Sequence, residues 1–431
     1  MPNRADARIQ RFDAYVERLA TALGHRDRHD PVRAYVTGLC LPGERKSIEP
    51  MAARVDPRNV QARHQSMHHF VANAAWDDAA VLRVARDTVL AALGRHGSVA
   101  AWIVDDTGIP KKGRHSVGVA RQYCGVLGKQ DNCQVAVSVS VAHERASVPV
   151  AYRLYLPEAW ARDRRRRRTA GVPPALKFLP KWQIALEQIA QLTAEGVPAA
   201  PVVADAGYGV VTAFRDQLTA RGVPYAVGIS SETTVWAPGR APLPPKKYPG
   251  HGRPASLVRR TARHRPLSVQ ALAQQLPTRA WHTVTWRDGT RGPMHSRFAA
   301  VRVRPAHRDE LRSTPRPEEW LLIEWPRAEA APTKYWLSTL APTATRGDLV
   351  HLAMLRWRIE RDYQELKDEI GLDHFEGRGW RGFHHHAALC IAAYAFLAAE
   401  RLAHFPPEPL AFLRPARLPK GFTPRGAPSA S

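Results

Sequence analysis

The stretch VAAWIVDDTG, residues 99–108, decides the fold class of this chain. Residues 99–104 form a short apolar run, which predicts a buried strand. Asp105 and Asp106 follow directly, so we expect the strand to end at this acidic pair. An acidic residue at a strand end is either a simple cap or a ligand held on a rigid sheet, and the rest of the chain has to decide between the two.

The segments that follow predict a mixed α/β sheet. Residues 133–141 alternate, with valine at every second position from 135, which predicts a half-buried strand. Residues 148–156 come after a short turn and are expected to be its hairpin partner. Helices near 182–192 and 211–220 then alternate with strands at 201–204 and 224–229. Three sequential strands followed by this alternation predict a mixed sheet with an antiparallel edge, flanked by helices.

The composition points to a polyanionic partner. The 63 Lys and Arg outnumber the 39 Asp and Glu, and the formal net charge is +24. Such an excess attracts nucleic acid, and the alternative is a general bias towards arginine. The four cysteines lack CxxC spacing, which argues against a zinc ribbon or a disulfide framework. No apolar run is long enough to span a membrane, and the N-terminus lacks a signal-peptide core, so we expect a cytoplasmic, nucleoid-associated protein.

Residues 230–340 interrupt the alternation of helix and strand. The segment is rich in proline, tryptophan and arginine, and WHTVTWRDGTRGPMHSRFAAVRVR (281–304) predicts two strands joined near Asp288 and Gly289. Two helices are expected to follow, at 348–370 and at about 384–404. We therefore predict a helical N-terminal DNA-binding region (1–95), the first part of the core (96–229), a β-rich insertion domain (230–340), C-terminal helices of the core (341–404) and a disordered tail (405–431).

Three carboxylates stand at places suited to two-metal chemistry. Asp106 ends the first strand, Asp205 ends the strand at 201–204, and Glu360 lies in the helix expected at 348–370. Phosphodiester cleavage needs an activated water and a stabilised leaving oxygen, and two divalent ions about 4 Å apart supply both. Mg²⁺ prefers oxygen ligands. Each carboxylate alone is more often a cap, but this set in this order predicts a site for two Mg²⁺ ions, for which Mn²⁺ can substitute.

The motifs around these residues resemble one known family. VDDTGIPKKGRHSVGVARQYCGVLGKQDNCQVAVSV (104–139) is similar to the first catalytic block of DDE transposases from bacterial insertion sequences, specifically insertion-sequence family 701. Further matches, in the expected order, are GERKSIEPMA (43–52), LYLPEAW (154–160), AGVP (170–173), VVADAGYG (202–209) and RWRIERDYQELKDEIGLDHFEGRGWRGFHHH (356–386). The resemblance therefore extends over nearly the whole chain, from about residue 11 to 404.

This resemblance implies a ribonuclease-H-like fold, interrupted by a β-rich insertion before the last carboxylate. The gap between Asp205 and Glu360 is far longer than one loop needs, as an insertion requires. The resemblance also implies that Asp106, directly before Thr107, is the first metal ligand rather than Asp105. Because neighbouring residues of a strand point to opposite faces, only one of the pair is expected to reach the metals, and the residues alone leave that choice open.

Eight basic residues are candidates for holding DNA phosphates. The resemblance places two of them at the basic positions around Glu360, although Ala353 stands where the family has tyrosine. Three more follow the first strand, and three belong to an arginine-rich cluster. Such contacts strengthen binding without selecting a sequence, and the alternatives are a surface ion pair on the helix or solvated loops. The eight are Lys111, Lys112, Arg114, Arg164, Arg165, Arg166, Arg356 and Lys367.

Three consecutive histidines, residues 384–386, lie in the last expected helix. Adjacent positions of a helix point in different directions, so these residues do not form one metal site. We predict that they are polar or DNA-proximal side chains.

The sequence thus predicts a DNA transposase, an endonuclease and polynucleotidyl transferase that acts on its element's terminal inverted repeats and on target DNA. A homodimer or higher oligomer on double-stranded DNA is expected, and no membrane partner. One alternative is a catalytically silent DNA-binding protein descended from a transposase. The other is a ribonuclease-H-like nuclease that never joins strands.

Overall fold

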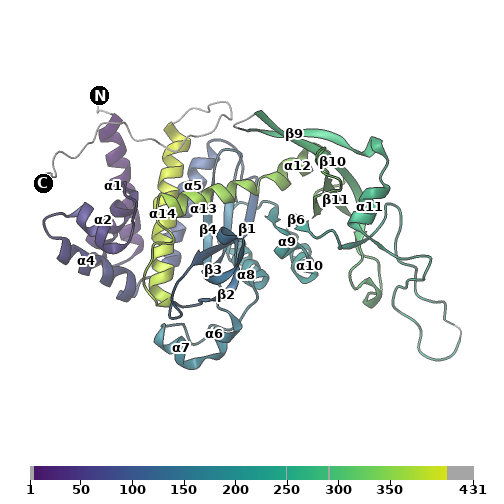
Figure 1. Cartoon of the computed structure of the whole chain (residues 1–431), viewed down its shortest axis with the longest axis horizontal. Helices are drawn as coiled ribbons and strands as arrows, with labels where there is room; N and C mark the ends of the chain where they lie inside the picture. Colours follow the sequence, from purple (N-terminus) through teal and green to yellow (C-terminus); the bar gives the residue numbers. More distant parts are fainter. Residues whose placement is uncertain (1–3, 249, 290–291, 405–431) are drawn as a thin grey trace, which may run out of the picture.

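A computed structural model describes residues 4–248, 250–289 and 292–404 as a mixed α/β structure with helices gathered at its N-terminus (Figure 1). The helices are α1 (Arg4–Ala22), α2 (His29–Cys40), α3 (Ile48–Val55), α4 (Val60–His68), α5 (Asp78–Gly94), α6 (Glu158–Arg162), α7 (Arg164–Thr169), α8 (Lys181–Ala194), α9 (Ala206–Gly209), α10 (Thr212–Ala220), α11 (Val269–Gln275), α12 (Arg346–Met354), α13 (Trp357–Asp368) and α14 (Trp380–His404). The strands are β1 (Ala101–Pro110), β2 (Ala120–Cys124), β3 (Lys129–Ala142), β4 (Ser147–Leu154), β5 (Val202–Ala204), β6 (Tyr225–Ile229), β7 (Thr234–Trp236), β8 (Leu267–Ser268), β9 (His282–Gly289), β10 (Gly292–Pro305), β11 (Glu319–Glu324) and β12 (Lys334–Ser338).

The described strands form one sheet, in the order β2-β3-β1-β5-β6-β12-β11-β10-β7-β8. β4 also pairs with β3, antiparallel, beyond the part of β3 that pairs with β2. β1 is antiparallel to β3 but parallel to β5, and β5 is parallel to β6. The predicted mixed sheet with an antiparallel edge, its flanking helices and the N-terminal helices are therefore confirmed.

The strands of the segment 230–340 extend this sheet. β12 pairs antiparallel with β6, and β11, β10 and β7 follow outward. The predicted strand pair around Asp288 is present as β9 and β10, which run antiparallel. Backbone hydrogen bonds thus connect the core strands to the later ones without a break, while the boundaries proposed for the five regions stay predictions.

Three local expectations were wrong. β1 does not end at the acidic pair but continues to Pro110, because β3 pairs with it along its whole length. β3 is not half-buried: its residues from Cys133 to Ala142 are all buried, and side chains of both α8 and α13 bond to it through Gln188 and Tyr363. The helix expected at 348–370 is divided into α12 and α13 at Leu355 and Arg356. The backbone carbonyls of these two residues accept hydrogen bonds from the N–H groups three residues later, in a tighter turn than that of a regular α-helix.

α14 is the central helix of the structure. It is long and apolar enough to cross a membrane by length and composition, with a mean hydropathy of 1.3, but 72% of that apolar window is buried inside the protein. A helix that is apolar all round and surrounded by protein is a core helix. Figure 1 shows it between the N-terminal helices and the sheet. The tail predicted to be disordered, 405–431, lies outside the described residues.

The three histidines of α14 are buried, so the prediction that they are DNA-proximal was wrong. The ring nitrogens of His385 lie 2.9 Å from the carbonyl oxygens of Val71 and Trp76. His386 lies 2.9 Å from both the Tyr35 hydroxyl and the Gly371 carbonyl. These side chains connect α14 to the N-terminal helices.

Acid is expected to weaken this connection through His386. Burial lowers the pKa of His386 to about 4, whereas an unfolded histidine titrates near 6.5. The unfolded chain therefore binds more protons between these values, so the stabilisation is complete above about pH 6.5 and is lost as the pH falls towards 4. Thermal unfolding followed from pH 8 to 4 should show this decline, and it should be shallower in His386→Gln.

The matched control is His69→Gln, because the His69 side chain is exposed. That variant should keep the slope of the wild type. An equal slope in His386→Gln and the wild type would remove His386 as a source of the acid sensitivity.

Candidate active site

Adjacent parallel strands place two aspartates side by side. Val104 of β1 is in register with Ala204 of β5, so the next residues, Asp105 and Asp205, occupy equivalent positions. In-register residues of parallel strands point to the same face, and successive residues of one strand point to opposite faces. Asp105 therefore shares a face with Asp205, and Asp106 points to the other face.

Arg356, at the start of α13, connects three carboxylates. One of its terminal nitrogens lies 3.0 Å from Oδ1 of Asp105 and 3.7 Å from Oδ2 of Asp205. Its other terminal nitrogen lies 3.6 Å from Oε1 of Glu360, one helical turn further on. The structure thus brings Asp105, Asp205 and Glu360 together around one guanidinium group.

Asp106, the first ligand predicted from the resemblance, has different partners. Its Oδ2 lies 2.5 Å from Nζ of Lys181 at the start of α8, and its Oδ1 accepts a hydrogen bond from the Tyr208 hydroxyl. Burial, followed by the nearby Asp106 carboxylate, raises the pKa of Tyr208 well above its usual value, so the hydroxyl remains a donor. Sequence reasoning missed Lys181 and Tyr208, although Tyr208 lies inside the quoted VVADAGYG motif.

Asp205 is held by the turn that follows β5. It is the N-cap of α9, and its Oδ1 accepts a hydrogen bond of 3.4 Å from the backbone N–H of Tyr208. Tyr208 therefore contacts Asp205 through its backbone and Asp106 through its side chain. Tyr208 thus links Asp205 to Asp106, which lies on the opposite face of β1.

α13 is fixed to the sheet by polar side chains beyond Glu360. Tyr363 donates a hydrogen bond to the hydroxyl of Ser138 on β3. Lys367 is only 8% exposed, and its Nζ lies 3.0 Å from the carbonyl oxygen of Gly108. Lys367 therefore faces β1, and its ammonium group is used within the protein rather than presented to a phosphate as predicted.

The site is partly buried. The Asp105 side chain is 12% exposed and that of Asp205 is 42% exposed, whereas Glu360 is 71% exposed. Burial, reinforced by the nearby Asp205 and opposed by Arg356, raises the pKa of Asp105 to about 6. This carboxyl group therefore binds a proton more readily than a free aspartate does, and a cation placed beside it would favour the ionised form.

The donor atoms at this site fit a hard divalent cation. Mg²⁺ takes carboxylate oxygens and keeps several waters, so two or three protein ligands are enough. Among the described residues, no three His, Cys, Asp or Glu side chains are close enough together to enclose one ion as they stand. The guanidinium of Arg356 lies among the carboxylates, and the exposed Glu360 side chain is the one with freedom to turn towards the two aspartates.

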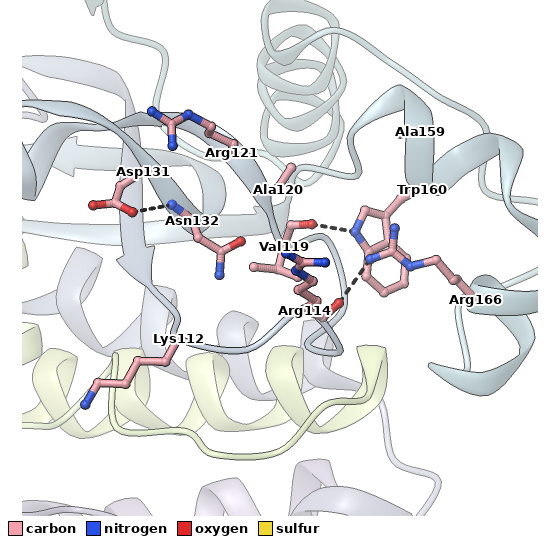
Figure 2. A pocket seen from close by; sticks show the side chains of 10 residues that line it. All are labelled: Lys112, Arg114, Val119, Ala120, Arg121, Asp131, Asn132, Ala159, Trp160 and Arg166. Atoms are coloured by element: carbon pink, nitrogen blue, oxygen red, sulfur yellow. Dashed lines mark hydrogen bonds between the residues drawn. The ribbon is translucent and has the colours of Figure 1, made fainter.

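Some of the predicted basic residues gather around a hollow of about 520 Å³ beside β2 and α7. Figure 2 shows Lys112, Arg114 and Arg166 lining it, together with Arg121, which the sequence did not single out. Arg166 lies over the ring of Trp160, 3.8 Å from its centroid, and donates to the Arg114 carbonyl at 3.1 Å.

The other predicted basic residues lie elsewhere. Arg164 and Arg165 are exposed on α7, which is an ordered helix with Asp163 as its N-cap. Lys111 is half-buried, with its Nζ 2.8 Å from the Phe375 carbonyl, and burial lowers its pKa. The exposed members, unlike Lys111 and Lys367, are therefore free to meet a polyanion.

Sequence comparison identifies the class to which this fold and site belong. The family described as DDE superfamily endonuclease matches residues 18–293, well over half of the chain, so the chain belongs to this family. A probable transposase for insertion sequence element IS701 from Microchaete diplosiphon is 32% identical over 170 residues. The aligned part covers 39% of this chain and only 40% of that relative. The family predicted from the motifs is confirmed, and Glu360 lies beyond the matched range.

Proposed function

We propose that this chain is a DNA transposase that cuts and joins phosphodiester bonds at the ends of its own insertion element. The observation that carries the proposal is the convergence of Asp105, Asp205 and Glu360 on Arg356 in a chain of the DDE endonuclease family. The named function of the Microchaete diplosiphon relative supports it.

We infer that the core is ribonuclease-H-like. The strands β4, β3, β1, β5 and β6 lie side by side, with β3 antiparallel to β1 and with β5 and β6 parallel to it. The carboxylates stand on the central strand, after the adjacent parallel strand and on a C-terminal helix. This placement supports a scaffold that holds two ligands rigidly and brings the third from a distant part of the chain.

Asp105, rather than Asp106, is the first ligand in this proposal. Asp105, Asp205 and Glu360 would hold two Mg²⁺ ions, and Mn²⁺ could substitute. When bound, these ions supply an activated water and a stabilised leaving oxygen. The strand register supports the choice, because Asp105 lies on the face of Asp205 while Asp106 is occupied by Lys181 and Tyr208.

The protein's own groups have separate tasks. Arg356 neutralises the carboxylates and is placed to meet a non-bridging phosphate oxygen of the scissile bond, since a guanidinium binds such oxygens bidentately. Tyr208 and Lys181 hold Asp106, and through it β1, in position. The freed 3′-hydroxyl of the element end would then attack a second phosphate in the same site, and the bond from that phosphorus to the 3′-oxygen of the attacked strand would break, which releases a new 3′-hydroxyl.

Duplex DNA is the proposed partner. The hollow beside β2 and α7 carries Lys112, Arg114, Arg121 and Arg166, with Asp131 as its one acidic residue, which favours phosphate contacts. Terminal inverted repeats and target DNA are the proposed substrates, and a homodimer or higher oligomer would bind two ends together. We place this activity in the cytoplasm, at the nucleoid.

Strand cleavage on labelled DNA carrying the element's terminal repeats tests the proposal. We expect nicking at the repeat boundary that requires Mg²⁺ or Mn²⁺ and is lost in Asp205→Ala and Glu360→Ala, while both variants still bind DNA. The matched control is Glu187→Ala, because Glu187 is a half-exposed carboxylate of α8 that is paired with Arg153 and not with Arg356. Glu187→Ala should cut normally.

Two outcomes would select the alternatives. A wild type that binds the ends but never cuts them, even with Mn²⁺, would be a catalytically silent DNA-binding protein. A wild type that cuts the DNA but cannot join pre-cleaved ends to a target would be a nuclease without strand transfer.

A further inference from the structure

A long basic arm, residues 237–266, connects β7 to β8. Figure 1 shows it as an excursion at the end of the molecule opposite the N-terminal helices. Its sequence contains eight Lys and Arg, seven prolines and no Asp or Glu. A segment with this composition cannot build an apolar core of its own, so its shape has to come from its attachment to the rest of the protein.

The base of the arm is firmly attached. Leu243 and Arg259 form a β-bridge, and the backbone N–H of Val258 donates to the Arg312 carbonyl at 2.9 Å. Arg260 forms an ion pair with Asp309, which is 1% exposed and also accepts a hydrogen bond of 2.5 Å from the Trp236 indole. The arm therefore leaves the sheet in a defined direction.

Most of the cations of the arm lie on its surface. Six side chains of the arm are exposed, and no described acidic side chain forms an ion pair with any of them. The six are Arg240, Lys246, Lys247, Arg253, Arg263 and Arg265. Among the described residues of the arm, the large apolar side chains that are exposed are Tyr248 and Leu257. The described residues of the arm also include no helix that could present an apolar face to a membrane.

We propose that this arm binds the phosphate backbone of duplex DNA at a site separate from the catalytic carboxylates. Each strand of the duplex carries one phosphate per 3.4 Å or so of the helix axis. The six residues from Leu243 to Tyr248 can extend about 20 Å, so the arm can follow several consecutive phosphates. Its cations are spread along the chain rather than gathered in a pocket, which suits a backbone contact without base selection.

The inference rests on the proposed function only in naming DNA as the polyanion. The test is the salt dependence of binding to a duplex of about 40 base pairs, measured by fluorescence anisotropy with full-length protein. Each phosphate contact adds about 0.9 to the slope of log K against log salt concentration. The variant Lys246→Gln/Lys247→Gln/Arg253→Gln should therefore bind more weakly and lose about 2 to 3 from this slope.

The matched control removes the same charge elsewhere. Arg145, Arg221 and Arg327 are exposed outside the arm, and Arg145→Gln/Arg221→Gln/Arg327→Gln should keep the slope. Equal slopes in the arm variant and the wild type, or an equal loss in both triple variants, would overturn the proposal. So would an arm variant that loses binding to anionic phospholipid vesicles but not to the duplex.

A second measurement separates this inference from the proposed function. If the wild type binds the duplex with the arm-dependent slope but never cuts it with Mg²⁺, the arm proposal holds and the transposase proposal fails. If the wild type cuts at the repeat boundary and the arm variant keeps the full slope, the arm proposal fails alone.

Discussion

Asp105→Asn is expected to abolish metal-dependent cleavage, whereas Asp106→Asn should retain measurable cleavage and metal binding. The physical reason is the register of β1 with β5, which places Asp105 on the face of Asp205 and turns Asp106 away. Loss of partners outside the ligand shell costs about 10- to 100-fold in metal affinity or activity, so loss of a ligand should cost more than about 100-fold. An asparagine at position 106 can still accept a hydrogen bond from the Tyr208 hydroxyl.

Mn²⁺ binding by calorimetry, without DNA, complements the cleavage assay. Asp105→Asn should bind Mn²⁺ far more weakly than the wild type, and Asp106→Asn should lie within about 100-fold of it. Circular dichroism of both variants checks that the fold survives. The reverse pattern, with binding lost in Asp106→Asn and kept in Asp105→Asn, would restore the ligand that the family resemblance implies.

Gly209→Ala is expected to cost at least about 3 kcal/mol of folding free energy, at the upper end of what overpacking usually costs. A Cβ at Gly209 would stand 1.8 Å from the carbonyl oxygen of Gly228 on β6, a backbone atom that cannot turn away. The first turn after Asp205 therefore lies directly on β6, backbone against backbone. Displacing it should also move Asp205, so the cleavage rate of the variant should fall.

Gly94→Ala is the matched control for this prediction. A Cβ at Gly94, the last residue of α5, meets no atom within 4 Å. Alanine is favoured over glycine in a helix by up to about 1 kcal/mol, so this variant should be as stable as the wild type or slightly more stable. Denaturant unfolding gives both free energies, and a Gly209→Ala protein as stable as the wild type would contradict the close approach.

The sequence was sufficient where the structural signal is local. The apolar run at 99–104, the alternating valines of 133–141 and the hairpin partner at 148–156 predicted β1, β3 and β4. The position of Asp205 directly after a short strand was likewise readable from the glycines that follow it. These signals depend on periodicity and on turn residues, which act over a few residues.

Burial could not be predicted in the same way. Ser138 and the three histidines of α14 are polar in sequence, yet they lie in the interior with hydrogen-bonding partners far along the chain. Lys367 carries a positive charge that could bind a DNA phosphate, but its ammonium group donates a hydrogen bond to the carbonyl oxygen of Gly108. A polar side chain is tolerated in the core when a partner is supplied there, and that partner belongs to the tertiary structure.

The sequence by itself determined the family, the mixed α/β class and the three regions from which carboxylates come. Only the tertiary structure decided which aspartate of the pair joins Asp205, because that depends on the register between two strands about a hundred residues apart. It also placed Arg356 among the three carboxylates and joined β12 to β6. The local sequence pattern determines which residues of a strand share a face, whereas the register with the neighbouring strands determines which residues each face contacts.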